Sequence, residues 1–332
     1  MTDANTSDAA GQRSSPTEQT TGETLSTEEV GTVAREVIDN VETVIVGNYP
    51  VIEHVVTALL GRGHVLLEDV PGVGKTMLAR AVAASFDCTF KRVQFTPDLL
   101  PSDITGVNVF NQKTREFEFQ PGPVFANIVL GDEINRAPPK TQSALLEAME
   151  EEQVTVDGET RKLPKPFSVI ATQNTVEPNR TYELPLAEVD RFMKKLHLGY
   201  PSATEEVDIL DRTVGRHPIE SLEPVADVET LQRARETAAE VTIKEPVRDY
   251  AAQLTGYTRN HAKLGVSPRG TIALLRASQG RALLNGRGYV IPDDVKEEAV
   301  AVLSHRIRVA EGSQTSAGTE IVEEALERIR VE

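Results

Sequence analysis

The 332-residue sequence is poor in the features that mark secreted, disulfide-bonded or membrane-spanning proteins. Its single cysteine, Cys88, has no partner in the chain, which excludes an intramolecular disulfide. No apolar run approaches the roughly 20 residues that cross a bilayer. The N-terminal segment is polar and acidic, whereas a secretory signal is basic and then apolar. We therefore expect a cytoplasmic protein without membrane insertion.

Two classes of catalytic site are also missing from the sequence. No Gly-x-Ser-x-Gly segment is present, which excludes the nucleophile elbow of the α/β-hydrolases. The histidines do not have the spacing of a metal-ligand set, and we expect them to be structural or surface groups. They are His54, His64, His197, His217, His261 and His305.

Basic residues are outnumbered, with 35 Lys and Arg against 51 Asp and Glu and a formal net charge of −16. Binding to DNA by counterion release would have to work against this negative field, so nucleic acid is a disfavoured partner. The 39% apolar and 26% charged content is that of an ordinary globular protein. The length is sufficient for two domains.

The sequence divides into a tail and two regions of different pattern. Residues 1–26 hold almost no large apolar residue and cannot offset their ordering entropy, so we expect a disordered acidic tail. In residues 27–200, strand-like and helical patterns alternate, which predicts an α/β core with a mainly parallel sheet. Two hairpin patterns, at 107–119 and 153–162, interrupt it. Residues 201–332 are patterned as helices throughout.

A glycine-rich turn between a strand pattern and a helix pattern is the strongest chemical signal. Its glycines allow backbone amides to point at phosphate oxygens, and the following helix adds its positive end. Lys75 can reach the β- and γ-phosphates, and the Thr76 hydroxyl can bind Mg²⁺. Asp69 stands where the full motif has a glycine, and the competing interpretation is a turn with a chance Lys-Thr pair. The candidate nucleotide-binding residues here are Pro71, Gly72, Val73, Gly74, Lys75, Thr76 and Met77.

Polar side chains end two further apolar strand patterns. Asp132 and Glu133 follow residues 128–131, where Asp132 can hold a metal-bound water and Glu133 can deprotonate the attacking water. Asn174 ends the pattern that starts at residue 168. The carboxyl ends of parallel strands converge on one crevice, so Asn174 can position the water or the γ-phosphate. Taken alone, these residues also fit a solvated strand end and a turn asparagine.

These residues resemble the MoxR family of AAA+ ATPases over roughly residues 37–309. The resemblance rests on residues 67–76, 132–151 and 171–174 and on Asp190-Arg191-Phe192. It implies a P-loop NTPase fold, with a three-layer α/β core and a C-terminal all-helical lid. Lys75 and Thr76 match Walker A, and Asp132 and Glu133 match Walker B.

The resemblance also gives roles to three residues that are uninformative in isolation. Asn174 matches sensor 1. Arg191 resembles the arginine finger, which reaches into the nucleotide site of a neighbouring subunit. Arg269, at a predicted helix start, resembles sensor 2, which links the lid to the γ-phosphate. The two hairpins correspond to insertions that face the pore of a ring in this branch of the AAA+ proteins.

The resemblance implies ATP and Mg²⁺ as ligands and a homo-oligomeric, hexameric ring that remodels or matures client proteins. It also implies von Willebrand factor A-type domain proteins as partners. ATP specificity rests on the resemblance alone, with Gly47 as a candidate wall of the adenine pocket. Two alternatives stay open. One is a nucleotide-gated scaffold with little turnover; the other is a DNA-translocating motor, which the acidic balance disfavours.

Overall fold

The computed structural model describes residues 24–174, 182–215, 217–309 and 317–331. The tail predicted for residues 1–26 lies almost entirely outside these described residues. In the described part of the chain, no helix combines the length and the apolar character that crossing a membrane requires.

A five-stranded parallel sheet forms the centre of the molecule. Its strands lie in the order β2-β5-β8-β1-β9, and every neighbouring pair is parallel. The predicted mainly parallel sheet is therefore confirmed. Strand β5 is buried along its whole length, as expected of a central strand with helices on both faces. The bounds are β1 Val65–Asp69, β2 Phe90–Gln94, β5 Ile128–Asp132, β8 Ser168–Asn174 and β9 Lys194–Leu196.

Helices cover both faces of this sheet and give the predicted three layers. Successive strand residues point to opposite faces, so Leu67 joins one apolar core and Leu66 the other. The core around Leu67 includes α1 Thr27–Glu42, α2 Tyr49–Leu60 and α3 Lys75–Ser85. The core around Leu66 includes α5 Pro139–Glu151, with α4 Pro101–Thr105, α6 Leu186–Val189 and the 3-10 turn Ile134–Arg136 nearby.

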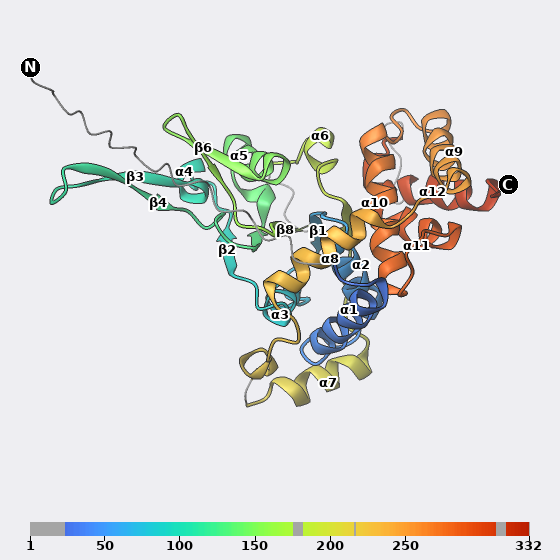
Figure 1. The fold of residues 1–332 in the computed structure, drawn as a ribbon, viewed down its shortest axis with the longest axis horizontal. Coiled ribbons are helices and arrows are strands. Elements are labelled where there is room, and N and C mark those ends of the chain that lie inside the picture. The colour runs from blue at the N-terminus through green and yellow to red at the C-terminus, as the bar shows by residue number, and fades with distance from the viewer. Residues whose placement is uncertain (1–23, 175–181, 216, 310–316, 332) are drawn as a thin grey trace, which may run out of the picture.

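Two antiparallel hairpins interrupt the α/β pattern, and both were predicted. They are β3 Gly106–Asn111 with β4 Glu116–Pro121, and β6 Gln153–Val156 with β7 Glu159–Lys162. The first projects from the body of the molecule as an arm (Figure 1). The two hairpins touch, because Asn108 donates to Asp157 at 2.8 Å and the Arg161 guanidinium lies 4.0 Å from the Phe119 ring centre.

The C-terminal region is all-helical, as predicted for the lid. It contains α7 Ala203–Thr213, α8 Val228–Glu240, α9 Glu245–His261, α10 Pro268–Leu284, α11 Pro292–Leu303 and α12 Ala317–Arg328, with 3-10 turns at Pro218–Ser221 and Ser304–Arg306. Most of these helices share one apolar core with α1 and α2. Gly280 allows α10 to lie close to α2, since a Cβ there would be 2.4 Å from the Thr57 carbonyl oxygen. The lid is thus packed against the N-terminal helices.

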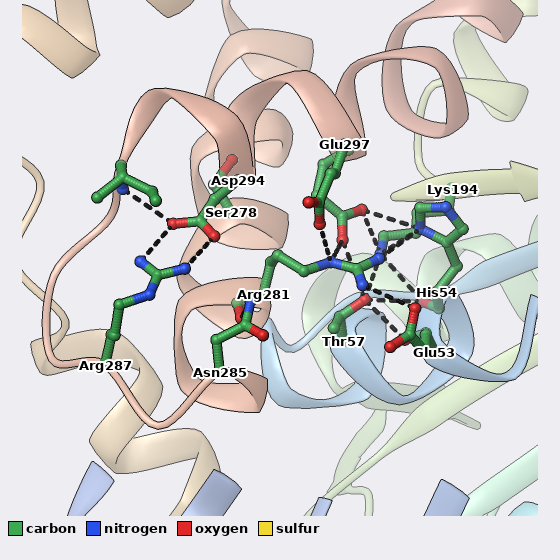
Figure 2. A network of polar contacts seen from close by, with 12 residues as sticks. Glu53, His54, Thr57, Lys194, Ser278, Arg281, Asn285, Arg287, Asp294 and Glu297 are labelled. Atoms are coloured by element: carbon green, nitrogen blue, oxygen red, sulfur yellow. Dashed lines mark hydrogen bonds and ion pairs between the residues drawn. The ribbon is translucent and has the colours of Figure 1, made fainter. Parts of the chain in front are cut away.

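A buried ionic network joins the sheet, α2 and the lid (Figure 2). Lys194 of β9 and Glu298 of α11 are fully buried, and their Nζ and Oε2 atoms are 2.5 Å apart. Arg281 of α10 binds the other Glu298 oxygen at 2.9 Å and Glu53 of α2 at 3.0 Å. Lys194 also donates to the Thr57 hydroxyl at 2.5 Å. Buried charges are tolerated only with such partners, so the network requires all three elements to stay in register.

Removal of one partner of the buried Lys194–Glu298 pair should destabilise the protein. Glu298→Ala leaves the buried Lys194 without its counter-ion, and we expect the free energy of unfolding to fall by about 3–5 kcal/mol. Urea titration measures the change. The matched control is Lys194→Met with Glu298→Leu, which removes both buried charges while Arg281 keeps Glu53. The double variant should be the more stable of the two, and equal losses would contradict this account.

The Glu298 carboxylate should also make the free energy of unfolding depend on pH. Burial alone raises the pKa of Glu298, but Lys194, His54 and Arg281 together hold it below its ordinary value of 4.5. A carboxyl with a depressed folded-state pKa stabilises the protein above its ordinary pKa, and this contribution is lost as the pH falls through the folded-state value. Unfolding measured at successive pH values below 4.5 should therefore show a smaller acid dependence in the double variant.

Candidate nucleotide-binding site

The glycine-rich turn connects the end of β1 to the start of α3. Gly72 and Gly74 have φ angles of +88° and +96°, a region that side chains rarely adopt. No heavy atom lies within 4 Å of where their Cβ atoms would be, so the glycines serve backbone conformation and not close packing. The turn places the N-terminus of α3 at the carboxyl edge of the sheet, where an anion is favoured.

Lys75 lies between this turn and strand β8. Its Nζ donates to the carbonyl oxygens of Asp69 and Val70, both at 2.8 Å, and to Asn174 Oδ1 at 3.2 Å. Burial lowers the pKa of Lys75, although Asp69, Asp132 and Glu133 act in the opposite direction. Its present acceptors are neutral oxygens, which a phosphate can replace with a charged and stronger acceptor.

Thr76 and Asp132 face each other across the crevice. The Thr76 hydroxyl is 3.4 Å from Asp132 Oδ2, which also accepts from Arg92 Nη2 at 2.6 Å. The Thr172 hydroxyl donates to Asp132 Oδ1 at 2.5 Å. One hydroxyl and one carboxylate are hard oxygen ligands that fit Mg²⁺, which usually takes its other ligands from phosphate and water.

Glu133 is held by three donors at the end of β5. Its Oε1 accepts from Asn174 at 2.5 Å, and its Oε2 accepts from Gln94 and Arg136, both at 2.7 Å. The residue has a left-handed φ of +57°, a strained conformation that is concentrated at functional sites. Asn174 therefore contacts both Lys75 and Glu133, and the structure brings these three predicted residues together.

The contacts of Gln94, Arg92, Arg136 and Thr172 were not predicted. Gln94 ends β2 and lies opposite Asp132 in the sheet register. A polar residue at a strand end was the signal that identified Asn174. The same signal was present at Gln94, but it points to the site only if β2 is the neighbour of β5, which the sequence does not show.

Asp69 and Gly47 lie on the lid side of the turn. Asp69 Oδ2 accepts from the Gly199 amide at 2.6 Å, so it connects the turn to the segment that leads into α7. Gly47 has a φ of +67°, and a Cβ there would lie 2.2 Å from Glu205 Oε1 of α7. Gly47 is thus in contact with the start of the lid; its predicted contact with adenine remains a prediction.

Arg191 and Arg269 lie together, but on the other edge of the sheet. Both contact Glu150 near the end of α5, Arg191 at 3.2 Å and Arg269 at 2.8 Å. The preceding residue, Met149, accepts from His64 at 3.0 Å, and His64 immediately precedes β1. The arginines are therefore at the amino edge of the sheet. A five-residue strand, about 16 Å, separates this edge from the glycine-rich turn.

This position bears on the predicted role of Arg269. Because α10 packs against α1 and α2, its N-terminus lies at the amino edge, away from the glycine-rich turn of the same chain, and the contact of Arg269 with a γ-phosphate stays a prediction. A cavity of about 220 Å³ lies beside the pair. Its lining includes Arg62, Arg191, Arg269, Arg276 and Arg306.

Comparison with known proteins agrees with this geometry. Residues 64–194 match a family described as the ATPase family associated with various cellular activities (AAA), and residues 257–326 match an AAA lid domain. The chain is 51% identical over 301 residues to the uncharacterised protein YeaC of Bacillus subtilis, covering 89% of this chain and 93% of that protein. It is 42% identical over 290 residues to Chaperone MoxR1 of Mycobacterium tuberculosis, covering 84% and 76% respectively.

A crystal structure of a candidate ATPase from Cytophaga hutchinsonii superposes with a TM-score of 0.86 at 38% identity. The match covers 92% of this chain and 97% of that chain. The whole arrangement of core and lid is therefore shared, and not the sheet alone.

Thr172 provides a direct test of the Mg²⁺ assignment. Its hydroxyl donates to the Asp132 carboxylate and accepts from the Glu133 backbone amide at 2.9 Å, so it orients Asp132 and fixes the backbone at Glu133. Thr172→Val keeps the shape and removes the hydroxyl, and we expect Mg²⁺-dependent ATP binding to weaken about 10- to 100-fold. A Mg²⁺ titration of ATP binding measures this. Thr155→Val, on the exposed hairpin, is the control; equal effects in both variants would contradict the assignment.

Proposed function

Because this chain belongs to the MoxR family of AAA+ ATPases, we propose that it binds Mg²⁺-ATP at the glycine-rich turn and hydrolyses it in a homo-oligomeric ring. The observation that carries the proposal is the separation of the site into two halves. Lys75, Thr76, Asp132, Glu133 and Asn174 converge on the carboxyl edge of the sheet, whereas the two predicted catalytic arginines lie at the amino edge.

One chain therefore supplies only part of a hydrolytic site. At the carboxyl edge, Arg92 and Arg136 are already bound to Asp132 and Glu133. Head-to-tail contacts, in which the amino edge of one subunit meets the carboxyl edge of the next, close into a ring when the rotation allows it. Such contacts bring Arg191 and Arg269 to the neighbour's γ-phosphate, where an arginine offsets the charge that develops during transfer.

Each residue at the carboxyl edge has a step in this proposal. Lys75 can exchange its carbonyl acceptors for the β- and γ-phosphates. Thr76 and Asp132 would hold Mg²⁺, which would supply neutralisation of phosphate charge. Glu133 accepts the proton of the attacking water. Asn174 orients the Glu133 carboxylate and the γ-phosphate from one side chain, since it already contacts both Lys75 and Glu133.

The wider role follows from the family and from the protruding hairpins. We propose residues 27–200 as the nucleotide-binding core and residues 201–332 as the lid of a cytoplasmic, hexameric motor that remodels or matures client proteins. Partners with von Willebrand factor A-type domains fit this role. The exposed β3–β4 arm, which carries Phe110 and Phe117 at its surface, is the proposed contact for the client.

The first test is Glu133→Gln. The variant should bind Mg²⁺-ATP as the parent does, because Lys75 and Asp132 are intact, while losing the base that contributes about 10²- to 10⁴-fold to the rate. Steady-state phosphate release and calorimetry measure the two properties. Glu229→Gln, an exposed glutamate in the first turn of α8, is the matched control. Turnover at the parental rate in Glu133→Gln would disprove the assignment, and no turnover in the parent, alone or with partners, would favour the nucleotide-gated scaffold.

The second test mixes two inactive variants. Arg191→Ala should bind ATP yet lose about 10³-fold or more in assembly-stimulated turnover. In a random mixture with Glu133→Gln, some sites combine an intact Glu133 with an intact Arg191 from the neighbour. Such sites should restore roughly a quarter of the parental turnover per subunit. Failure to recover any turnover in rings shown to be mixed would exclude action of Arg191 on the neighbouring site.

A further inference from the structure

One carboxylate, Glu150, lies between the two arginines. Its Oε2 is 3.2 Å from Arg191 Nη1, and its Oε1 is 2.8 Å from Arg269 Nη2. Each oxygen therefore takes one guanidinium. Arg191 also donates to the Leu146 carbonyl at 2.8 Å, one turn earlier on α5. Helix α5 thus holds Arg191 at two points and Arg269 at one.

This arrangement needs a counter-ion, because it brings two positive charges from separate elements to the same place. Arg191 follows α6 in the α/β core, whereas Arg269 belongs to the first turn of α10 in the lid. Without Glu150 the two guanidinium groups repel each other, and their long side chains are free to separate. Two other acids lie nearby. Asp190 binds Arg306 at 2.6 Å. Glu188 is half-buried, and this burial raises its pKa against the opposing charge of Arg191.

Glu150 does not use up the arginine donors. A guanidinium has five N–H donors. Arg269 donates one of them to Glu150, whereas Arg191 donates one to the Leu146 carbonyl and meets Glu150 as an ion pair. The side chains of Arg191 and Arg269 are 30% and 53% exposed. Both arginines can therefore bind a second anion while they stay paired with Glu150.

We propose that Glu150 is a positioning residue for the arginine pair: it holds Arg191 and Arg269 side by side so that their remaining donors meet the γ-phosphate of the next subunit. The inference rests on the proposed action of these arginines on the neighbouring site. Glu150 itself touches no reacting atom and acts through the two guanidinium groups.

The position of α5 suggests a competing explanation for an effect of Glu150 on turnover, and experiment can distinguish the two. The helix begins three residues after Arg136, which holds Glu133, and its 13 residues span about 20 Å to the arginine edge. In the competing explanation, Glu150 acts along this helix on Glu133 of its own chain. Its direct contacts with Arg191 and Arg269 favour the neighbouring site.

The test is Glu150→Gln, which keeps the size of the side chain and removes its charge. We expect turnover in the ring to fall about 10- to 100-fold, because misplacement of a catalytic group by about 1 Å costs this much. ATP affinity and melting temperature should stay at the parental values. Glu147→Gln, an exposed glutamate one turn earlier on α5, is the matched control and should keep full turnover.

Mixed rings then assign Glu150 to a site. Mixing Glu150→Gln with Glu133→Gln should restore turnover, whereas mixing it with Arg191→Ala should not, because Glu150 and Arg191 then serve the same half of the site. The opposite pattern, or full turnover in Glu150→Gln alone, would overturn the proposal. A failure of the proposed function would look different. If Arg191 did not act on the neighbouring site, Arg191→Ala and Glu133→Gln would not complement each other.

Discussion

The common direction of the five strands is the constraint on which this structure depends. Because all five run in parallel, their carboxyl ends gather Lys75, Asp132, Glu133 and Asn174 on one edge of the sheet. The same constraint places the amino ends on the opposite edge, where Arg191 precedes β9. Strand direction thus places the glycine-rich turn with Asp132 and Glu133 on one edge of the sheet, and Arg191 and Arg269 on the other.

The sequence was most informative where function and strand pattern coincide. The glycine-rich turn and the Asp132-Glu133 pair could be predicted because each combines an apolar strand with a local chemical motif. Gln94 was missed although it also ends a strand, because strand order is set by packing between distant segments. The helix start at Arg269 was predicted, but the place of Arg269 beside Arg191 was not, for a similar reason. Its local sequence shows a helix start, but the helix packs against α1 and α2 across more than 200 residues of chain.

The lid of this protein is held more firmly than a flexible cover would be. Its helices share an apolar core with α1 and α2, and the Lys194–Glu298–Arg281 network crosses the same junction with fully or nearly fully buried charges. Such a junction resists small sliding movements, since each displacement would leave a charge without its partner. Arg269 at the start of α10 is therefore carried on the same body as the amino edge of the sheet.

Asp69 gives the glycine-rich turn a second attachment. Its carboxylate accepts from the Val70 amide within the turn and from Gly199 beyond β9, so a single side chain fastens the turn to the chain that enters α7. A turn with glycine at this position would have no such fastening. Any widening of the turn around a triphosphate must either break the hydrogen bond between Asp69 and Gly199 or move the segment that leads into α7. Nucleotide occupancy is therefore mechanically coupled to the start of the lid.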